Sequence, residues 1–197
     1  QRLRVMPNTT KTKAPLLIPS SRRLSYRLMD ENDGDLLWEI DQDPLVMKYI
    51  NGGYPTSKDD IKQIFLPRLA SYRNETKGWG LWQINHIESH DFIGWLLIRP
   101  MDFFTDKCNV NNIELGWRLK KRYWGLGYAT EAAFAAVKTL WSVTNIQSLW
   151  ALVDPKNVAS VSVIKKLGMQ HHKSAIHKDP LGDTYADYFC LQKTPNA

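Results

Sequence analysis

The chain has 197 residues, of which 43% are hydrophobic and 11% aromatic. This length and composition exclude wholesale disorder and predict one folded domain with its own core. Two cysteines without a CxxC pair exclude a disulfide scaffold and a cysteine zinc site. They fit a reducing compartment, so we expect a cytoplasmic protein. No apolar run approaches the roughly 20 residues of a membrane helix, so we expect no membrane partner.

The net charge of +6 comes from the start of the chain. Residues 1–23 carry six basic residues and no acidic one, so residues 24–197 are balanced in charge. We therefore expect residues 1–21 to form a basic, flexible tail and residues 22–197 to form a single domain. Six dispersed charges do not make the basic patch that nucleic-acid binding needs, so binding through the tail is only a minor alternative.

Hydrophobic patterning, punctuated by glycine, proline and asparagine, predicts short strands and helices without internal repeats. In chain order, the expected elements of the first half are a strand at Leu24–Leu28, a helix from the capping residues Asp30–Asp33 through Ile40, a loop at Asn51–Pro55, a helix from Ser57 toward Arg73 that Pro67 bends or breaks, and strands at Trp79–Ile84 and Phe92–Ile98. Those of the second half are a strand at Ile113–Leu119, a helix at Tyr128–Trp141 with Phe134, Val137 and Trp141 on one face, a strand at Leu149–Val153, a helix from Asn157 that ends at Gly168, and strands at Met169–Ile176 and Thr184–Leu191. This order predicts an α+β fold.

The strand Ile113–Leu119 has the clearest alternation of apolar and other residues. One face is apolar and carries Ile113, Leu115, Trp117 and Leu119. The opposite face carries Glu114, Gly116 and Arg118. A period of two therefore directs the carboxylate and the guanidinium away from the apolar row.

A glycine-rich turn, Arg122-x-x-Gly125-x-Gly127, joins this strand to the helix Tyr128–Trp141. Glycine lets the backbone bend and bring its N–H groups close to a ligand, and the helix directs the positive end of its dipole to the same place. Together they predict an anion site suited to a pyrophosphate, to which Arg122 can add a charge-assisted hydrogen bond.

Two alternative interpretations of this turn stay open. A Rossmann fingerprint needs a third small residue where Thr130 stands, although Asp154 lies roughly where its acidic residue belongs. The turn could also be a lead-in to the helix that binds no ligand. A Walker A loop, by contrast, is excluded because no Gly-Lys-Ser/Thr occurs.

Two blocks in the right order resemble the GNAT N-acetyltransferase superfamily. The run that starts at Glu114 and includes the turn is similar to the family's acetyl-CoA motif, Gln/Arg-x-x-Gly-x-Gly/Ala. The block Asn157-x-x-Ser160 is similar to the family's later helix. One branch of the family acetylates the N-termini of ribosomal proteins. This chain resembles that branch in the same block and in the runs of sequence that begin at Arg23 and at Asp43-Pro. The resemblance covers residues 22–192.

The resemblance implies a mixed α/β domain whose central, mostly antiparallel sheet splays open between flanking helices. It also implies an enzyme that transfers the acetyl group of acetyl-CoA to a primary amine of a protein N-terminus or small molecule by direct attack on the thioester. The cofactor contacts that it implies are Trp117, Arg118, Leu119, Arg122, Gly125, Leu126, Gly127, Tyr128, Ala129, Asn157 and Lys166.

Two residues are assigned catalytic roles. Glu114 is the expected base for the amine, and a backbone N–H on the strand is expected to stabilise the developing oxyanion. Many family members carry a tyrosine acid seven residues after the asparagine, but Ile164 stands there, so Ser160 is assigned as hydrogen-bond donor to the thiol. The alternatives are an exposed or ion-paired Glu114, a Ser160 that bonds to its own helix, and an Asn157 that only caps the helix.

The acceptor site is the part about which the sequence says least. Trp38 and Tyr54 are expected to line it, with a packed aromatic and an ordinary loop as the alternatives. The five histidines have no metal-ligand spacing, so no metal is expected. We expect a monomer or a homodimer. A non-catalytic CoA-binding module of the same fold is the main rival, followed by a nucleic-acid-associated protein.

Overall fold

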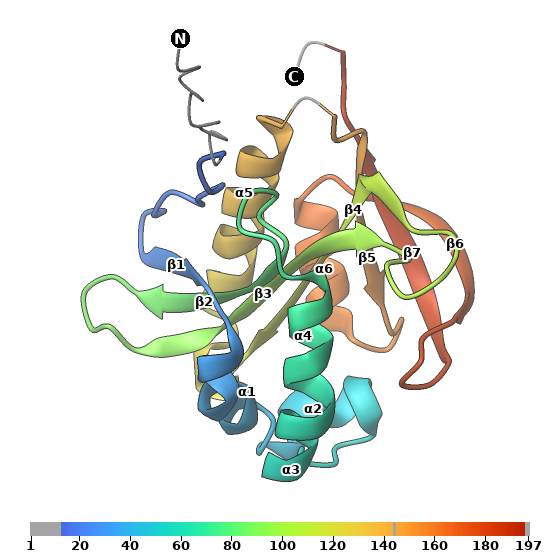
Figure 1. Cartoon of the computed structure of the whole chain (residues 1–197). Helices are drawn as coiled ribbons and strands as arrows, with labels where there is room; N and C mark the ends of the chain where they lie inside the picture. The colour runs from blue at the N-terminus through green and yellow to red at the C-terminus, as the bar shows by residue number, and fades with distance from the viewer. Residues whose placement is uncertain (1–12, 144, 196–197) are drawn as a thin grey trace, which may run out of the picture.

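The computed structural model describes residues 13–143 and 145–195. Seven strands form one sheet in the order β1-β2-β3-β4-β5-β7-β6, in which only β4 and β5 run parallel (Figure 1). The strands are β1 (Leu24–Leu28), β2 (Gly80–His86), β3 (Phe92–Met101), β4 (Asn109–Leu119), β5 (Ser148–Val153), β6 (Gln170–His177) and β7 (Thr184–Gln192). The expected α+β fold with a mostly antiparallel sheet is thereby confirmed.

Helices cover both faces of this sheet, with α1–α4 on one face and α5 and α6 on the other (Figure 1). The helices are η1 (Glu31–Asp33), α1 (Gly34–Ile40), α2 (Pro44–Asn51), α3 (Lys58–Asp60), η2 (Ile61–Phe65), α4 (Leu66–Tyr72), η3 (Lys121–Tyr123), α5 (Tyr128–Trp141) and α6 (Val158–Lys166). The helix α2 was not predicted, although its start has a recognisable signal. The side chain of Asp43 accepts from the N–H of Leu45, and Pro44 occupies the first turn.

The segment from α3 to α4 shows how a helix tolerates Pro67. Ser57 caps its start by accepting a hydrogen bond from the N–H of Asp60, as predicted. One turn before the proline the helix widens to a π-helix, in which the N–H of Leu66 donates to the carbonyl of Ile61. The chain therefore remains helical through Pro67, because the wider turn accommodates the residue that lacks an N–H.

The two faces of β4 belong to different layers. Ile113, Leu115 and Leu119 are buried in the main core, which α5 and α6 cover, and Trp117 packs against it. Glu114 and the other alternate residues face the layer of α1–α4. The period of two predicted for this strand is confirmed, and β4 thus connects both layers.

The helix α5 buries Val137 of the predicted face and packs Trp141 against the main core, but it leaves Phe134 outside. Phe134 is 49% exposed, so its assignment to the buried face was wrong. The buried residues are mostly small ones: Ala132, Ala133, Ala136, Val137, Thr139 and Leu140. Alanines allow the helix axis to approach the sheet closely, and close packing in this layer outweighs the burial of one large ring.

Part of the expected tail packs against the domain. The side chain of Ile18 is 5% exposed and lies in the main core. The N–H of Leu16 donates to the carbonyl of Glu75 at 2.9 Å. These contacts place residues 16–18 in the folded body, whereas residues 1–12 lie outside the described part of the chain.

Candidate active site

The sheet opens between β4 and β5. Their pairing covers only Asn112–Glu114 of β4, and residues 115–119 do not pair with β5. The N–H of Lys120 donates to Ile93 of β3, so alternation turns the N–H groups of Trp117 and Leu119 toward the opening. The splay expected beside this strand is present, and its β4 side presents free backbone donors.

The glycine turn lies beyond the end of β4. Gly125 and Gly127 have φ angles of +74° and +81°, which glycine adopts without the penalty of a Cβ. Gly127 is the N-cap of the 14-residue helix α5, and no side chain caps that end. The first N–H groups of α5 are therefore open to a ligand, and they carry the positive end of the helix dipole. This arrangement fits the pyrophosphate of a nucleotide cofactor.

Most side chains around the turn are occupied by other contacts. The Arg122 guanidinium donates to the hydroxyl of Tyr123 at 2.6 Å and stacks on its ring. Tyr128 packs edge-on against the same ring, while Leu119 and Ala129 pack in the main core. Of the expected cofactor contacts, Trp117, Leu119, Tyr128 and Ala129 can therefore offer chiefly their backbone, and Leu126 is exposed at the surface of the turn.

A cluster that the sequence analysis did not identify supports this turn. Arg23, just before β1, donates to the carbonyl of Leu126 at 2.8 Å and to a carboxylate oxygen of Glu131 at 2.7 Å. Ser21 donates to the other carboxylate oxygen at 2.6 Å. Burial opposes the charge on Glu131, but these hydrogen bonds outweigh it and lower the pKa of the carboxyl. Tyr26, which contacts Ser21, is buried deeply enough to raise its pKa to about 12.

The start of α6 carries the second predicted motif. Asn157 caps the helix by accepting from the N–H of Ser160 at 3.2 Å, so the capping interpretation is correct. The Ser160 hydroxyl is half-buried and has no hydrogen bond within the described chain, unlike Thr139, which bonds back to the carbonyl of Ala135. The alternative that Ser160 bonds to its own helix is therefore not observed. Ile164 is buried in the core, so no acid occupies that position.

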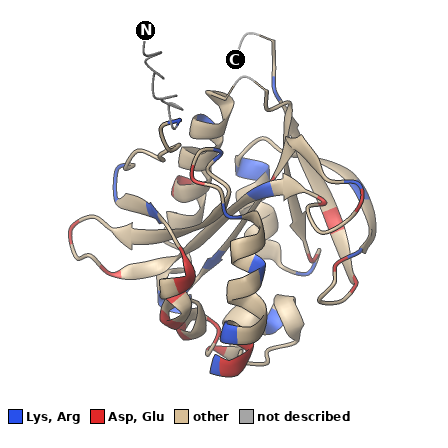
Figure 2. Cartoon of the chain, in the orientation of Figure 1, with Lys and Arg blue, Asp and Glu red and all other residues tan. Residues whose placement is uncertain are grey.

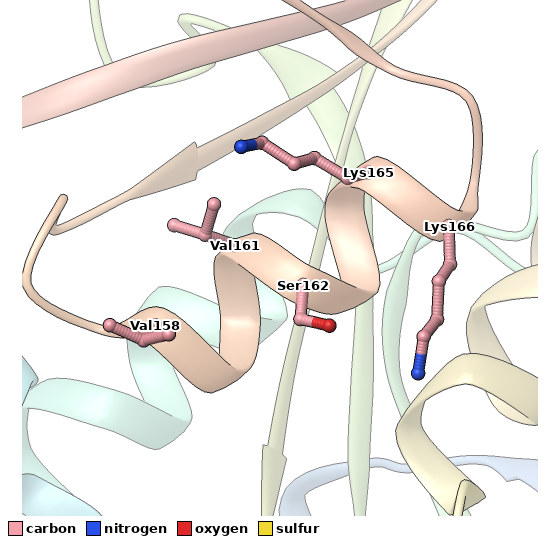
Figure 3. A pocket seen from close by; sticks show the side chains of 5 residues that line it. All are labelled: Val158, Val161, Ser162, Lys165 and Lys166. Carbon is pink, nitrogen blue, oxygen red and sulfur yellow. The ribbon is translucent and has the colours of Figure 1, made fainter.

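An open pocket of about 420 Å³ runs along the exposed side of α6 (Figure 3). Its lining is Val158, Val161, Ser162, Lys165 and Lys166. The two lysines diverge in Figure 3, where Lys165 extends to the left and Lys166 downward, and both are exposed. Lys166 can thus reach an anionic ligand, whereas Asn157 and Ser160 do not line this pocket.

Glu114 lies on the other face of the sheet, in a buried ion pair. Its carboxylate accepts from Arg99 of β3 at 3.1 and 3.5 Å, and the two side chains are only 11% and 12% exposed. Burial disfavours the charged guanidinium, but the adjoining negative charge keeps the pKa of Arg99 above its ordinary value. The ion pair named as the alternative for Glu114 is therefore present, and a role as base has to be exercised from within this pair. The pair borders a small pocket that His177 and Asp179 also line.

The side chain of Arg118 is also held in an ion pair on the same face of the sheet. Its guanidinium pairs with Asp41 at 2.8 Å and stacks on the ring of Trp95. Thr56 donates to the other oxygen of Asp41. Alternation along β4 thus directs this side chain away from the glycine turn, and the backbone groups of Arg118 face β3, so the expected cofactor contact at Arg118 is wrong.

The two expected acceptor residues have different surroundings. Trp38 of α1 is half-buried and packs against the core cluster in the layer of α1–α4. The ammonium of Lys58 lies 4.7 Å from the centre of its ring. Tyr54 is 73% exposed in a loop that Asn51 fixes by bonding both backbone groups of the tyrosine. Trp38 is a packed aromatic, and Tyr54 is a free surface residue.

Within residues 13–143 and 145–195, no three His, Cys, Asp or Glu side chains are grouped closely enough to hold a metal ion. In the same part of the chain, no helix is long and apolar enough to cross a membrane.

Solved acetyltransferases share this fold. The solved aminoglycoside acetyltransferase AAC(6')-Ib in complex with coenzyme A shares the fold, with a TM-score of 0.67 at 16% identity over 86% of this chain and 95% of that one. RimL, a ribosomal L7/L12 α-N-protein acetyltransferase in complex with coenzyme A, gives 0.68 at 14% identity over 89% and 97%.

The family follows from the sequence comparison. Residues 23–170 match the acetyltransferase (GNAT) domain, so the chain belongs to the GNAT acetyltransferase family. It is also 32% identical to the uncharacterised protein YkkB of Bacillus subtilis over 155 residues, which is 77% of this chain and 84% of that protein. The catalytic interpretation is therefore favoured over a CoA-binding module without activity, and acetyl-CoA is the cofactor of the family.

Proposed function

We propose that this acetyltransferase acetylates a primary amine at the free edge of β4, where donor and acceptor meet. The observation that carries the proposal is the opening of the sheet beyond Glu114. At that point β4 has the glycine turn beyond one end and α6 over one face, while Glu114 projects from the other face. A donor seated along the opening is therefore within reach of an amine that approaches from the layer of α1–α4.

The donor site is built mainly from backbone groups. The amides of the turn and of the first turn of α5 bind the pyrophosphate, and Lys166 adds a positive charge. The free N–H of Leu119 pairs with an amide carbonyl of the pantetheine arm, as a neighbouring strand would, which leaves the N–H of Trp117 for the thioester. Acetyl-CoA supplies the activated thioester.

The reaction forms a C–N bond and breaks a C–S bond. The incoming ammonium first loses a proton, which Glu114 accepts through a bridging water because its own oxygens face Arg99. The N–H of Trp117 stabilises the negative charge that develops on the carbonyl oxygen. The Ser160 hydroxyl donates a hydrogen bond to the departing thiolate, which takes up a proton by way of water.

The charge distribution favours a cationic acceptor. Residues 30–60 contain nine acidic residues and two basic ones, and much of the ribbon coloured for acidic residues lies around α1 and α3 (Figure 2). The body of the protein is neutral in sum, but this layer is not, and it attracts amines. Protein N-termini and small-molecule amines, the acceptors that the names of RimL and AAC(6')-Ib state for those enzymes, are the two candidate classes. Tyr54 and Trp38 would border their approach.

A reducing, cytoplasmic location is part of the same proposal. Cys108 and Cys190 are both free thiols, as proteins of reducing compartments usually have.

Calorimetric titration with acetyl-CoA, with NAD as the control, tests the donor site. We expect micromolar binding of acetyl-CoA and none of NAD. Release of free CoA thiol in the presence of a panel of peptides and small amines then tests the chemistry. Absence of acetyl-CoA binding would refute the proposed donor site. Binding without thiol release for any amine would favour the non-catalytic module.

A further inference from the structure

The segment just before β1 is fastened to the glycine turn by several contacts. The backbone N–H of Arg23 donates to Glu131 at 2.8 Å, and its Nε donates to the other carboxylate oxygen at 2.7 Å. Its Nη1 donates to the carbonyl of Leu126 at 2.8 Å, and the guanidinium lies 4.4 Å above the ring of Tyr128. One side chain therefore contacts the turn, the first turn of α5 and the aromatic residue between them.

The contact to Leu126 determines how the turn presents its amide. The peptide bond between Leu126 and Gly127 is planar, and its oxygen and its N–H point in opposite directions. Because Arg23 holds the oxygen, the N–H of Gly127 is directed away from the guanidinium and toward the open side of the turn. The φ of +81° at Gly127 depends on this orientation.

The contacts to Glu131 remove an electrostatic conflict. A carboxylate in the first turn of α5 stabilises the helix, but it also repels an anion bound at the same end. Ser21 and Arg23 occupy both oxygens of Glu131, and the arginine adds the compensating positive charge. The helix end thus keeps its acidic residue without losing its attraction for phosphate.

We infer that Arg23 is a positioning residue of the pyrophosphate site. It orients the amide of Gly127 and neutralises Glu131, and so acts through these two groups on the donor. The inference rests on the proposed donor site. It assigns a function in cofactor binding to a residue at the junction of the expected tail and the domain.

The test compares two acetyl donors. Acetyl-CoA carries the pyrophosphate, whereas S-acetylpantetheine carries the same thioester and no phosphate. We expect Arg23→Ala to lower kcat/KM for acetyl-CoA by about tenfold, the equivalent of one charge-assisted hydrogen bond, and to change kcat/KM for S-acetylpantetheine by less than about twofold. Arg27→Ala is the matched control, because Arg27 of β1 also pairs with a carboxylate, that of Asp33, but hydrogen-bonds neither the turn nor α5 and should alter neither value.

A second pair of variants keeps the result interpretable. Arg23→Lys retains the charge but cannot reach both Leu126 and Glu131. It should therefore lose kcat/KM for acetyl-CoA selectively, as Arg23→Ala does, but by a smaller factor. This variant tests the inference even if Arg23→Ala does not fold. Adding Glu131→Gln to Arg23→Ala should recover part of the lost kcat/KM for acetyl-CoA, because the uncompensated charge is gone. An equal loss with both donors, or no loss with acetyl-CoA, would overturn the inference. Failure of the wild type to bind acetyl-CoA would instead overturn the proposed function.

Discussion

Replacing Glu114 by glutamine separates the structural role of this residue from its chemical one. The substitution keeps the size of the side chain and removes its charge. Arg99 is then left as a cation that is 12% exposed, beneath the rings of Tyr72 and Phe104. The amide oxygen can still accept one hydrogen bond from the guanidinium, so part of the contact survives.

The expected cost follows from this burial. Breaking a buried ion pair by removing one partner costs about 3–5 kcal/mol, and the surviving hydrogen bond places Glu114→Gln near about 3 kcal/mol. For a domain of this size, that loss lowers Tm by about 6–12 °C. Glu75→Gln is the matched control, because Glu75 pairs with Arg73 but is 63% exposed, and such a pair contributes less than about 1 kcal/mol.

Circular dichroism during thermal unfolding measures the loss of stability. The value of kcat at a temperature well below the variant's Tm measures the chemical effect. If Glu114 is the base, kcat falls by about 10²–10⁴ while the protein remains folded. The double variant Arg99→Met with Glu114→Gln should regain much of the lost stability and none of the activity. A loss of stability as small as that of Glu75→Gln would contradict the buried pair. An unchanged kcat would show that Glu114 is not the base.

Three further substitutions address the donor site. Gly127→Ala forces a Cβ into a left-handed position 3.3 Å from Arg23 and should weaken acetyl-CoA binding by about tenfold or more, whereas Gly52→Ala has the same strain at φ +87° and should lower only Tm. Ser160→Ala should lower kcat by about tenfold and leave Tm and the Kd of acetyl-CoA unchanged, because the hydroxyl has no partner in the described chain to lose. Glu131→Gln should lose stability relative to the wild type at neutral pH, and the difference should shrink in the acid range below the ordinary pKa of 4.5.

The sign of the last prediction follows from the lowered pKa of Glu131. The folded state holds the carboxylate ionised, so its contribution is complete above the unfolded value and is lost as the pH falls through the folded one. A difference that grows in acid would contradict it. Equal effects of Gly127→Ala and Gly52→Ala on binding would contradict the donor site, and a lowered Tm in Ser160→Ala would show that the hydroxyl has a structural role.

Local features were the most predictable part of the molecule. The alternation along β4, the glycine at the start of α5 and the cap at Asn157 all depend on residues within a few positions of one another. Their periods and turn chemistry are visible in the sequence, and the structure agrees with them. The same holds for Ser57, whose cap needs only the N–H of Asp60.

Contacts between distant segments were not predictable in this way. Arg23 and Glu131 are 108 residues apart, and the partner of Glu114 depends on the register that places Arg99 directly opposite it. The role of Phe134 was wrong for a related reason, since the sheet selects the alanine stripe of α5 and not its largest side chain. Sequence patterns identify which residues can act, but the packing of the layers determines their partners.

The opening of the sheet gives the proposed cofactor a structural role in the fold. On its β5 side, β4 leaves the amides of Trp117 and Leu119 without a partner strand. In the absence of the donor, water must solvate these groups inside the domain, and under the proposed function the pantetheine arm takes the place of the missing strand. Thermal stability is therefore linked to donor supply. Each tenfold rise in acetyl-CoA above its Kd adds about 1.4 kcal/mol, so cells rich in the donor hold the protein in a more stable form.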